Sequence, residues 1–231
     1  MEYTLHFETE HFKLLYQKAD EGVGIEYKEI VQNAYNRIVM DCGFLPHELD
    51  EKIHFYICKN VDDYLYFTNK KREEYQNWMV GYSDYDNRRI CMLSPKAVID
   101  YPVEELKNII AHEITHMVFD TYCGVINGEA WISEGVALLY GEQIYLNYVD
   151  VNAYPKISEI AGKCIDGDTP DQFVNNFGYD YAGIYVWYFI KKYGFEKFLL
   201  AYKNELILDE YIWNGYEKEA IDAYIEFTGK N

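Results

Sequence analysis

The sequence predicts an α+β protein in which a small lobe with a mixed β-sheet precedes a mainly helical lobe. The first hundred residues mix short strand patterns with helix patterns. From Pro102 onward, apolar residues recur mainly at helical spacing. No internal repeat and no low-complexity linker separates these regions, so we expect a single domain of 231 residues with lobes at 1–100 and 101–231.

Four strands are expected in the first lobe. Apolar residues alternate well enough for a strand at 11–16, and 52–58 reads as a second strand. Two further runs, 79–82 and 88–93, flank the turn-like segment 83–87. Because a short turn between two strand patterns is typical of a hairpin, we expect the last two strands to pair.

Two helices are expected in the same lobe. One covers 26–42, where apolar residues lie at helical spacing and Gly43 provides an end signal. The other covers 61 to about 78. The apolar residues that define the first helix are Ile30, Val31, Ala34, Ile38 and Val39.

The second lobe is expected to begin with a helix at Pro102. Proline suits the first turn of a helix, where its missing N–H costs nothing. Glu104 and Glu105 place negative charge at the positive end of the helix dipole. Further helices are expected at about 130–147, 181–193, 195–204 and 216–227.

The charge of the chain bears on its partners. Asp and Glu number 39 against 21 Lys and Arg, which gives a net charge of −18. Such a chain should repel nucleic acid and anionic membrane surfaces, so neither is expected as a partner. The sequence shows no signal peptide and no apolar run long enough to span a bilayer. We therefore expect a soluble cytoplasmic protein, and the sequence leaves its oligomeric state open.

The cysteines give no sign of a disulfide framework or of a cysteine zinc site. Their number is odd, their spacing is wide and no two form a CxxC pair, so ordinary reduced thiols are expected. The five cysteines are Cys42, Cys58, Cys91, Cys123 and Cys164.

The segment His112-Glu-Ile-Thr-His116 carries the strongest chemical signal in the chain. Residues four apart on a helix share one face, so both imidazoles would point at one place, with Glu113 beside it. Imidazole nitrogens suit Zn²⁺, and a carboxylate beside the metal suits a general base. The same spacing also arises by chance, so a third ligand at a sensible distance is needed.

Glu134 is the preferred third ligand. It lies in Trp131-Ile-Ser-Glu-Gly-Val-Ala137, which is expected on a helix that packs across the first. The small residues Gly135 and Ala137 would allow a close approach of the two helices. Two histidines and one glutamate leave one zinc position open for water, as catalytic zinc requires. Alternatively, Glu134 is an ordinary first-turn glutamate that the helix dipole favours.

Together, HEITH and WISEGVA resemble the gluzincin metallopeptidases, and most closely the peptidase MA-like proteins related to the aminopeptidase N catalytic domain. The resemblance implies a zincin-like fold and a zinc cofactor held by His112, His116 and Glu134, with Glu113 as general base. The metzincins are a poor fit, since they need glycine and a third histidine soon after the motif.

The resemblance leaves two residue assignments open. Glu129 is a rival ligand, because its surroundings resemble the thermolysin-type Asn-Glu-Ala segment. The family also implies a group that binds the oxyanion, and no histidine follows His116, so a tyrosine must supply it. Tyr179 fits the family's register, but the glycine that this register requires lies one place late, at Gly183, so Tyr181 is the alternative.

Two further features have both a functional and a plain interpretation. In gluzincins, the strand that corresponds to 88–93 is an edge strand that pairs with the substrate backbone, but here it is equally well an ordinary sheet strand. Asp120 lies four residues after His116 and would accept a hydrogen bond from a ligating imidazole, unless it is a solvated acid near a helix end.

These features predict a zinc metallopeptidase that acts on a peptide or protein substrate. The aminopeptidase signature Gly-Ala-Met-Glu-Asn is absent before His112, so nothing argues for removal of single N-terminal residues. One alternative is a non-catalytic zinc-binding protein with the same fold that acts in binding or regulation. Another is a hydrolase of amides or esters other than peptides.

Overall fold

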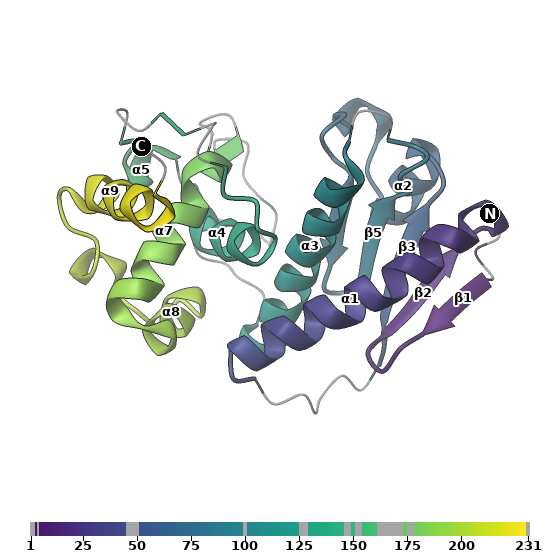
Figure 1. Cartoon of the computed structure of the whole chain (residues 1–231), viewed down its shortest axis with the longest axis horizontal. Helices are drawn as coiled ribbons and strands as arrows, with labels where there is room; N and C mark the ends of the chain where they lie inside the picture. The colour runs from purple at the N-terminus through teal and green to yellow at the C-terminus, as the bar shows by residue number, and fades with distance from the viewer. Residues whose placement is uncertain are drawn as a thin grey trace. The chain divides into compact units, whose positions relative to one another are not determined.

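The structure is a computed structural model that describes residues 3, 5–44, 51–98, 101–124, 129–145, 149–150, 154–160, 173–174 and 178–229 (Figure 1). It is mixed α+β, as predicted, and one sheet of five strands precedes most of the helices. The α-helices in the described ranges are α1 (Glu21–Asp41), α2 (Val61–Thr68), α3 (Val103–Cys123), α4 (Ala130–Tyr140), α5 (Ile157–Ile160), α7 (Gly178–Tyr193), α8 (Phe195–Tyr202) and α9 (Tyr216–Thr228).

The chain divides into two compact units, Met1–Val118 and Phe119–Asn231. The boundary falls inside α3, which is one continuous helix of 21 residues. The first unit therefore contains the sheet together with most of α3, which the sequence analysis assigned to the helical lobe.

The sheet is mixed. Its strands are β1 (Leu5–Glu8), β2 (Phe12–Tyr16), β3 (Ile53–Cys58), β4 (Gly81–Asp84) and β5 (Arg89–Leu93), in the spatial order β1-β2-β3-β5-β4. The three inner strands β2, β3 and β5 are parallel, and β1 and β4 each pair antiparallel with their inner neighbour. Three predicted strands and the pairing of β4 with β5 are confirmed. The strand predicted at 79–82 lies two residues later, at Gly81–Asp84, and β1 was not predicted.

Of the two interpretations of 88–93, the ordinary sheet strand is confirmed and the edge strand is not. The strand predicted at 88–93 as a possible edge is β5, which lies between β3 and β4. The edge strand at this end of the sheet is β4, because the hairpin folds back on the outer side of β5, and β1 forms the opposite edge. Alternation within 88–93 identifies a strand, but it contains no information about which neighbours that strand acquires.

Helices cover both faces of the sheet. Successive side chains of a strand point to opposite faces, so neighbouring residues of one strand contact different helices. Phe55 of β3 lies on one face, where its ring meets Tyr27 of α1 edge-on with centroids 6.4 Å apart. The neighbouring Tyr56 points to the other face, where it stacks on Phe67 of α2 at 4.2 Å. Figure 1 shows α1 in front of the strands. The fully buried residues of the α1 face include Phe12, Leu14, Ile53, Phe55, Ile57, Ile90 and Met92.

Two predicted helices are shorter in the structure than expected. The helix predicted to reach about residue 78 ends at Thr68, because Asn69 adopts a left-handed backbone conformation with φ 55°. The helix predicted over 130–147 ends at Tyr140, and Glu142 is left-handed with φ 54°. A left-handed residue breaks the run of hydrogen bonds from each N–H to the carbonyl four residues earlier, so neither helix continues. Residues 146 and 147 of the second prediction lie outside the described residues.

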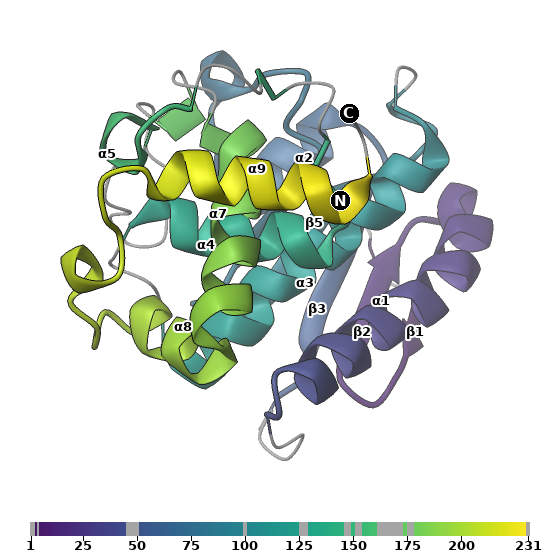
Figure 2. The same cartoon turned by 60° about the vertical axis from the view of Figure 1, so that its left-hand side comes forward.

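In the second unit, α4 packs against α7 at very short range. A Cβ built on Gly135 of α4 would lie 2.5 Å from the carbonyl oxygen of Ala182 and 2.5 Å from Val186 Cγ2. A Cβ built on Gly183 of α7 would lie 3.3 Å from Leu138 Cβ of α4. Helix α9 also packs against α7. The Tyr216 hydroxyl of α9 donates a hydrogen bond to the backbone carbonyl oxygen of Tyr185 in α7 at 2.7 Å. Figure 2 shows α4, α7 and α9 in this arrangement.

Two remaining expectations concern particular side chains and membrane spans. The described cysteines Cys42, Cys58, Cys91 and Cys123 are thiols rather than disulfides, and Cys164 lies outside the described residues. Within the described ranges, none of the helices combines the length and the apolar character needed to cross a bilayer.

The close approach of α4 and α7 at Gly135 predicts that a larger side chain at this position destabilises the protein. Gly135→Ala would place a methyl group against the backbone of α7, which cannot move aside without separating the helices. We expect the substitution to lower the free energy of unfolding by about 1–3 kcal/mol, measured by urea denaturation. Gly22→Ala is the matched control, since nothing lies within 4 Å of a Cβ at Gly22. Equal stability of the two variants would contradict the prediction.

Candidate metal centre

Helix α3 positions the histidine pair. It begins directly after Pro102, as predicted, and continues for more than five turns. Its apolar residues Leu106, Ile110, Ile114 and Met117 are at most 1% exposed, so this side of the helix is packed in the interior. The histidines lie on a different stripe of the helix and remain half-buried. The burial of the apolar side therefore fixes the direction in which the two imidazoles point.

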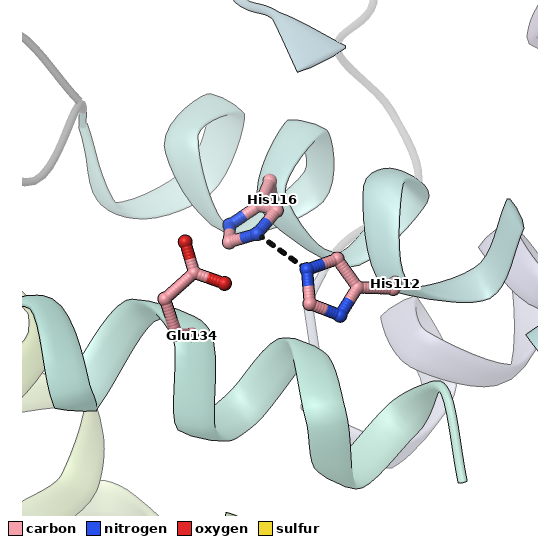
Figure 3. A group of neighbouring side chains, drawn as sticks. All are labelled: His112, His116 and Glu134. Carbon is pink, nitrogen blue, oxygen red and sulfur yellow. Dashed lines mark hydrogen bonds between the residues drawn. The ribbon is translucent and has the colours of Figure 1, made fainter. Parts of the chain in front are cut away.

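The two imidazoles face each other. His112 Nε2 and His116 Nε2 lie 3.1 Å apart, and the ring planes are inclined by 73°. Figure 3 shows Glu134 extending from α4 toward the same place. One nitrogen from each ring and one oxygen of Glu134 all lie within 4.8 Å of one another. The three residues that the sequence analysis selected as ligands thus form one group, which does not include Glu129.

The donor set and its spacing fit a metal of the zinc type. Two imidazole nitrogens and one carboxylate oxygen are zinc ligands, and a tetrahedral site with bonds of about 2.0–2.1 Å places its ligand atoms roughly 3.3 Å apart. The nitrogen pair at 3.1 Å already has this separation. The largest separation among the three ligand atoms, up to 4.8 Å, exceeds the tetrahedral value, so these atoms have to move closer together when a cation binds. Both Nε2 atoms must then be unprotonated, with each ring proton on Nδ1.

Glu113 lies next to the start of the edge strand β4. Its side chain is 8% exposed. A Cβ built on Gly81, the first residue of β4, would lie only 2.7 Å from Glu113 Oε1. The absence of a side chain at Gly81 is therefore what allows the carboxylate to lie against the strand.

A buried tyrosine supports this contact. The Tyr64 hydroxyl donates a hydrogen bond to the Gly81 carbonyl oxygen at 2.8 Å. Burial raises the pKa of the Tyr64 phenol, and the negative charge of Glu113 adds to the effect. The hydroxyl thus keeps its proton at neutral pH and continues to hold the first residue of β4 beside Glu113.

The two candidate tyrosines for oxyanion binding differ in their surroundings. Tyr181 is 6% exposed, and its hydroxyl oxygen accepts a hydrogen bond from the backbone N–H of Asp150 at 3.3 Å. Tyr179 is half-buried, and its ring meets Phe173 edge-on with centroids 4.9 Å apart. Tyr181 is therefore engaged by the backbone, whereas Tyr179 is the more accessible of the two.

Asp120 is not simply a solvated acid near a helix end. Its Oδ1 accepts a hydrogen bond from the hydroxyl of Tyr202 in α8 at 3.0 Å. Ser133, the residue before Glu134, is hydrogen-bonded to the same hydroxyl. Tyr202 and Ser133 were not predicted from the sequence, because the chain has 25 tyrosines and no local pattern distinguishes this one.

Comparison of the chain with models of known protein families gives no match, and comparison with curated protein sequences gives none either.

Proposed function

We propose that this protein is a zinc-dependent metallopeptidase of the gluzincin type, similar to the peptidase MA-like proteins. The observation that supports this proposal most directly is the group formed by His112, His116 and Glu134, with the acid Glu113 next to one of its members. Three protein ligands leave a fourth position for water, which is the arrangement of catalytic rather than structural zinc.

In this proposal, His112, His116 and Glu134 would hold Zn²⁺, which when bound would supply a water molecule with a pKa of about 7 and polarise the scissile carbonyl. Glu113 is the general base, which takes the proton of the attacking water and then returns it to the leaving amine. Tyr179 donates a hydrogen bond to the developing oxyanion.

The edge strand β4 supports a peptide as the substrate. An edge strand presents backbone N–H and C=O groups with which an extended peptide can pair. Gly81, the first residue of β4, lies against the Glu113 carboxylate. A peptide that extends the sheet along β4 would thus bring its backbone close to the general base.

Metal binding is the first test of the proposal. The purified wild type should retain about one zinc ion per chain after dialysis, and His116→Ala should retain almost none, because two protein ligands hold zinc poorly. His54→Ala is the matched control, since His54 is an exposed residue of β3. Metal analysis of the three proteins measures the outcome. Parental zinc content in His116→Ala would contradict the proposed ligand set.

Removal of the base separates catalysis from metal binding. We expect Glu113→Gln to keep its zinc and to cleave a mixture of unstructured peptides about 10²–10⁴-fold more slowly than the wild type. Glu104→Gln, an exposed change in the first turn of α3, should retain full activity. Zinc-loaded wild type that cleaves no peptide would instead favour a binding protein, and cleavage of model amides alone would favour a different hydrolase.

The contact between Gly81 and Glu113 predicts a third effect. The methyl group of Gly81→Ala would lie 2.7 Å from Glu113 Oε1, so the carboxylate must move. Displacement of a catalytic group by about 1 Å can cost on the order of 10²-fold in rate, so we expect a loss of this size in kcat with zinc retained. Ser83→Ala in the same strand serves as the control. An unchanged kcat for Gly81→Ala would show that the position of Glu113 does not depend on Gly81.

A further inference from the structure

A chain of two hydrogen bonds joins the last turn of α3 to the beginning of α4. The Tyr202 hydroxyl has one hydrogen, and the carboxylate of Asp120 accepts it at 3.0 Å. The hydrogen bond between Ser133 and the same hydroxyl must therefore be donated by Ser133. Tyr202 thus accepts a hydrogen bond from α4 and donates one to α3. All three residues belong to the second compact unit.

The aromatic ring of Tyr202 holds this hydroxyl in place. The side chain is 1% exposed, and its ring centroid lies 4.9 Å from that of Phe119 and 6.4 Å from that of Phe198. Both phenylalanines are themselves buried. A ring packed in this way has one available orientation, so its hydroxyl acts as a fixed point rather than as a mobile polar group.

The two ends of this chain of hydrogen bonds, Asp120 and Ser133, lie next to candidate ligands. Asp120 follows His116 by one helical turn, so it extends the stripe on α3 that carries His112 and His116. Ser133 directly precedes Glu134 in α4. The hydroxyl of Tyr202 therefore connects the histidine stripe to the helix that carries the carboxylate ligand.

We propose that Tyr202 is a positioning residue, which sets the ligand stripe of α3 against α4 and thereby raises the affinity of the centre for zinc. This inference rests on the proposed function, since it assumes that His112, His116 and Glu134 bind the metal. Without the chain of hydrogen bonds, α4 can shift or rotate relative to α3. Part of the binding free energy of the metal is then consumed in restoring the ligand geometry.

The test compares two tyrosines that differ in this connection. Tyr202→Phe removes one oxygen atom from the chain of hydrogen bonds and keeps the packed ring. Tyr193→Phe removes a hydroxyl that donates to the carbonyl oxygen of Tyr211 at 2.9 Å in the same unit. Zinc dissociation constants are measured by competition with a chromogenic chelator. We expect about 10-fold weaker binding or more for Tyr202→Phe, and no change for Tyr193→Phe.

Two further variants separate positioning from general destabilisation. In Asp120→Asn the amide oxygen still accepts the Tyr202 hydrogen, so zinc affinity should stay within a few-fold of wild type. Ser133→Ala removes the other hydrogen bond and should weaken zinc binding, which provides a test even if Tyr202→Phe does not fold. Thermal unfolding of each metal-free variant measures its stability without zinc. A variant that loses zinc affinity but unfolds at the same temperature as the wild type has lost positioning and not general stability.

The outcomes distinguish this inference from the proposed function. If the wild type binds no zinc, the proposed function fails and the inference fails with it. If the wild type binds zinc and Tyr202→Phe binds it as tightly as Tyr193→Phe, only the positioning role is overturned. Unchanged zinc affinity in Ser133→Ala would likewise overturn it.

Discussion

The candidate site depends first on the regularity of one helix. Hydrogen bonds from each N–H of α3 to the carbonyl four residues earlier fix its period, and this period puts His112, His116 and Asp120 on one stripe. The burial of its apolar side then orients that stripe. A break in the helix between the histidines would turn the second imidazole away from the first, and no adjustment of the side chains would restore the pair.

The candidate metal ligands were more predictable from the sequence than the elements and contacts that position them. The spacing of His112 and His116 and the segment around Glu134 are local patterns, so sequence alone selected the three residues that lie together. The ends of helices depend on single left-handed residues. Asn69 is of a type that often ends helices, but Glu142 carries no such sequence signal. The place of β5 inside the sheet and the contact of Tyr202 with Asp120 depend on tertiary packing, which no sequence window contains.

Electrostatics favour a cation at this place in the molecule. Glu113 and Glu134 are both less than a tenth exposed, in a chain whose net charge is −18. Burial of carboxylates is costly unless positive charge or hydrogen bonds offset it. In the proposed centre, a divalent ion held by the imidazoles would supply such a charge, with Glu134 as a third ligand.

The origin of Tyr202 far along the chain has a consequence for biosynthesis. The tyrosine lies 82 residues after Asp120, so it leaves the ribosome long after the histidine segment and the glutamate have emerged. A nascent chain that ends before α8 contains every candidate ligand but lacks the hydroxyl that joins the two helices. Capture of the ion during translation would therefore be weak at first, and it would strengthen only when the last third of the polypeptide has folded against the rest.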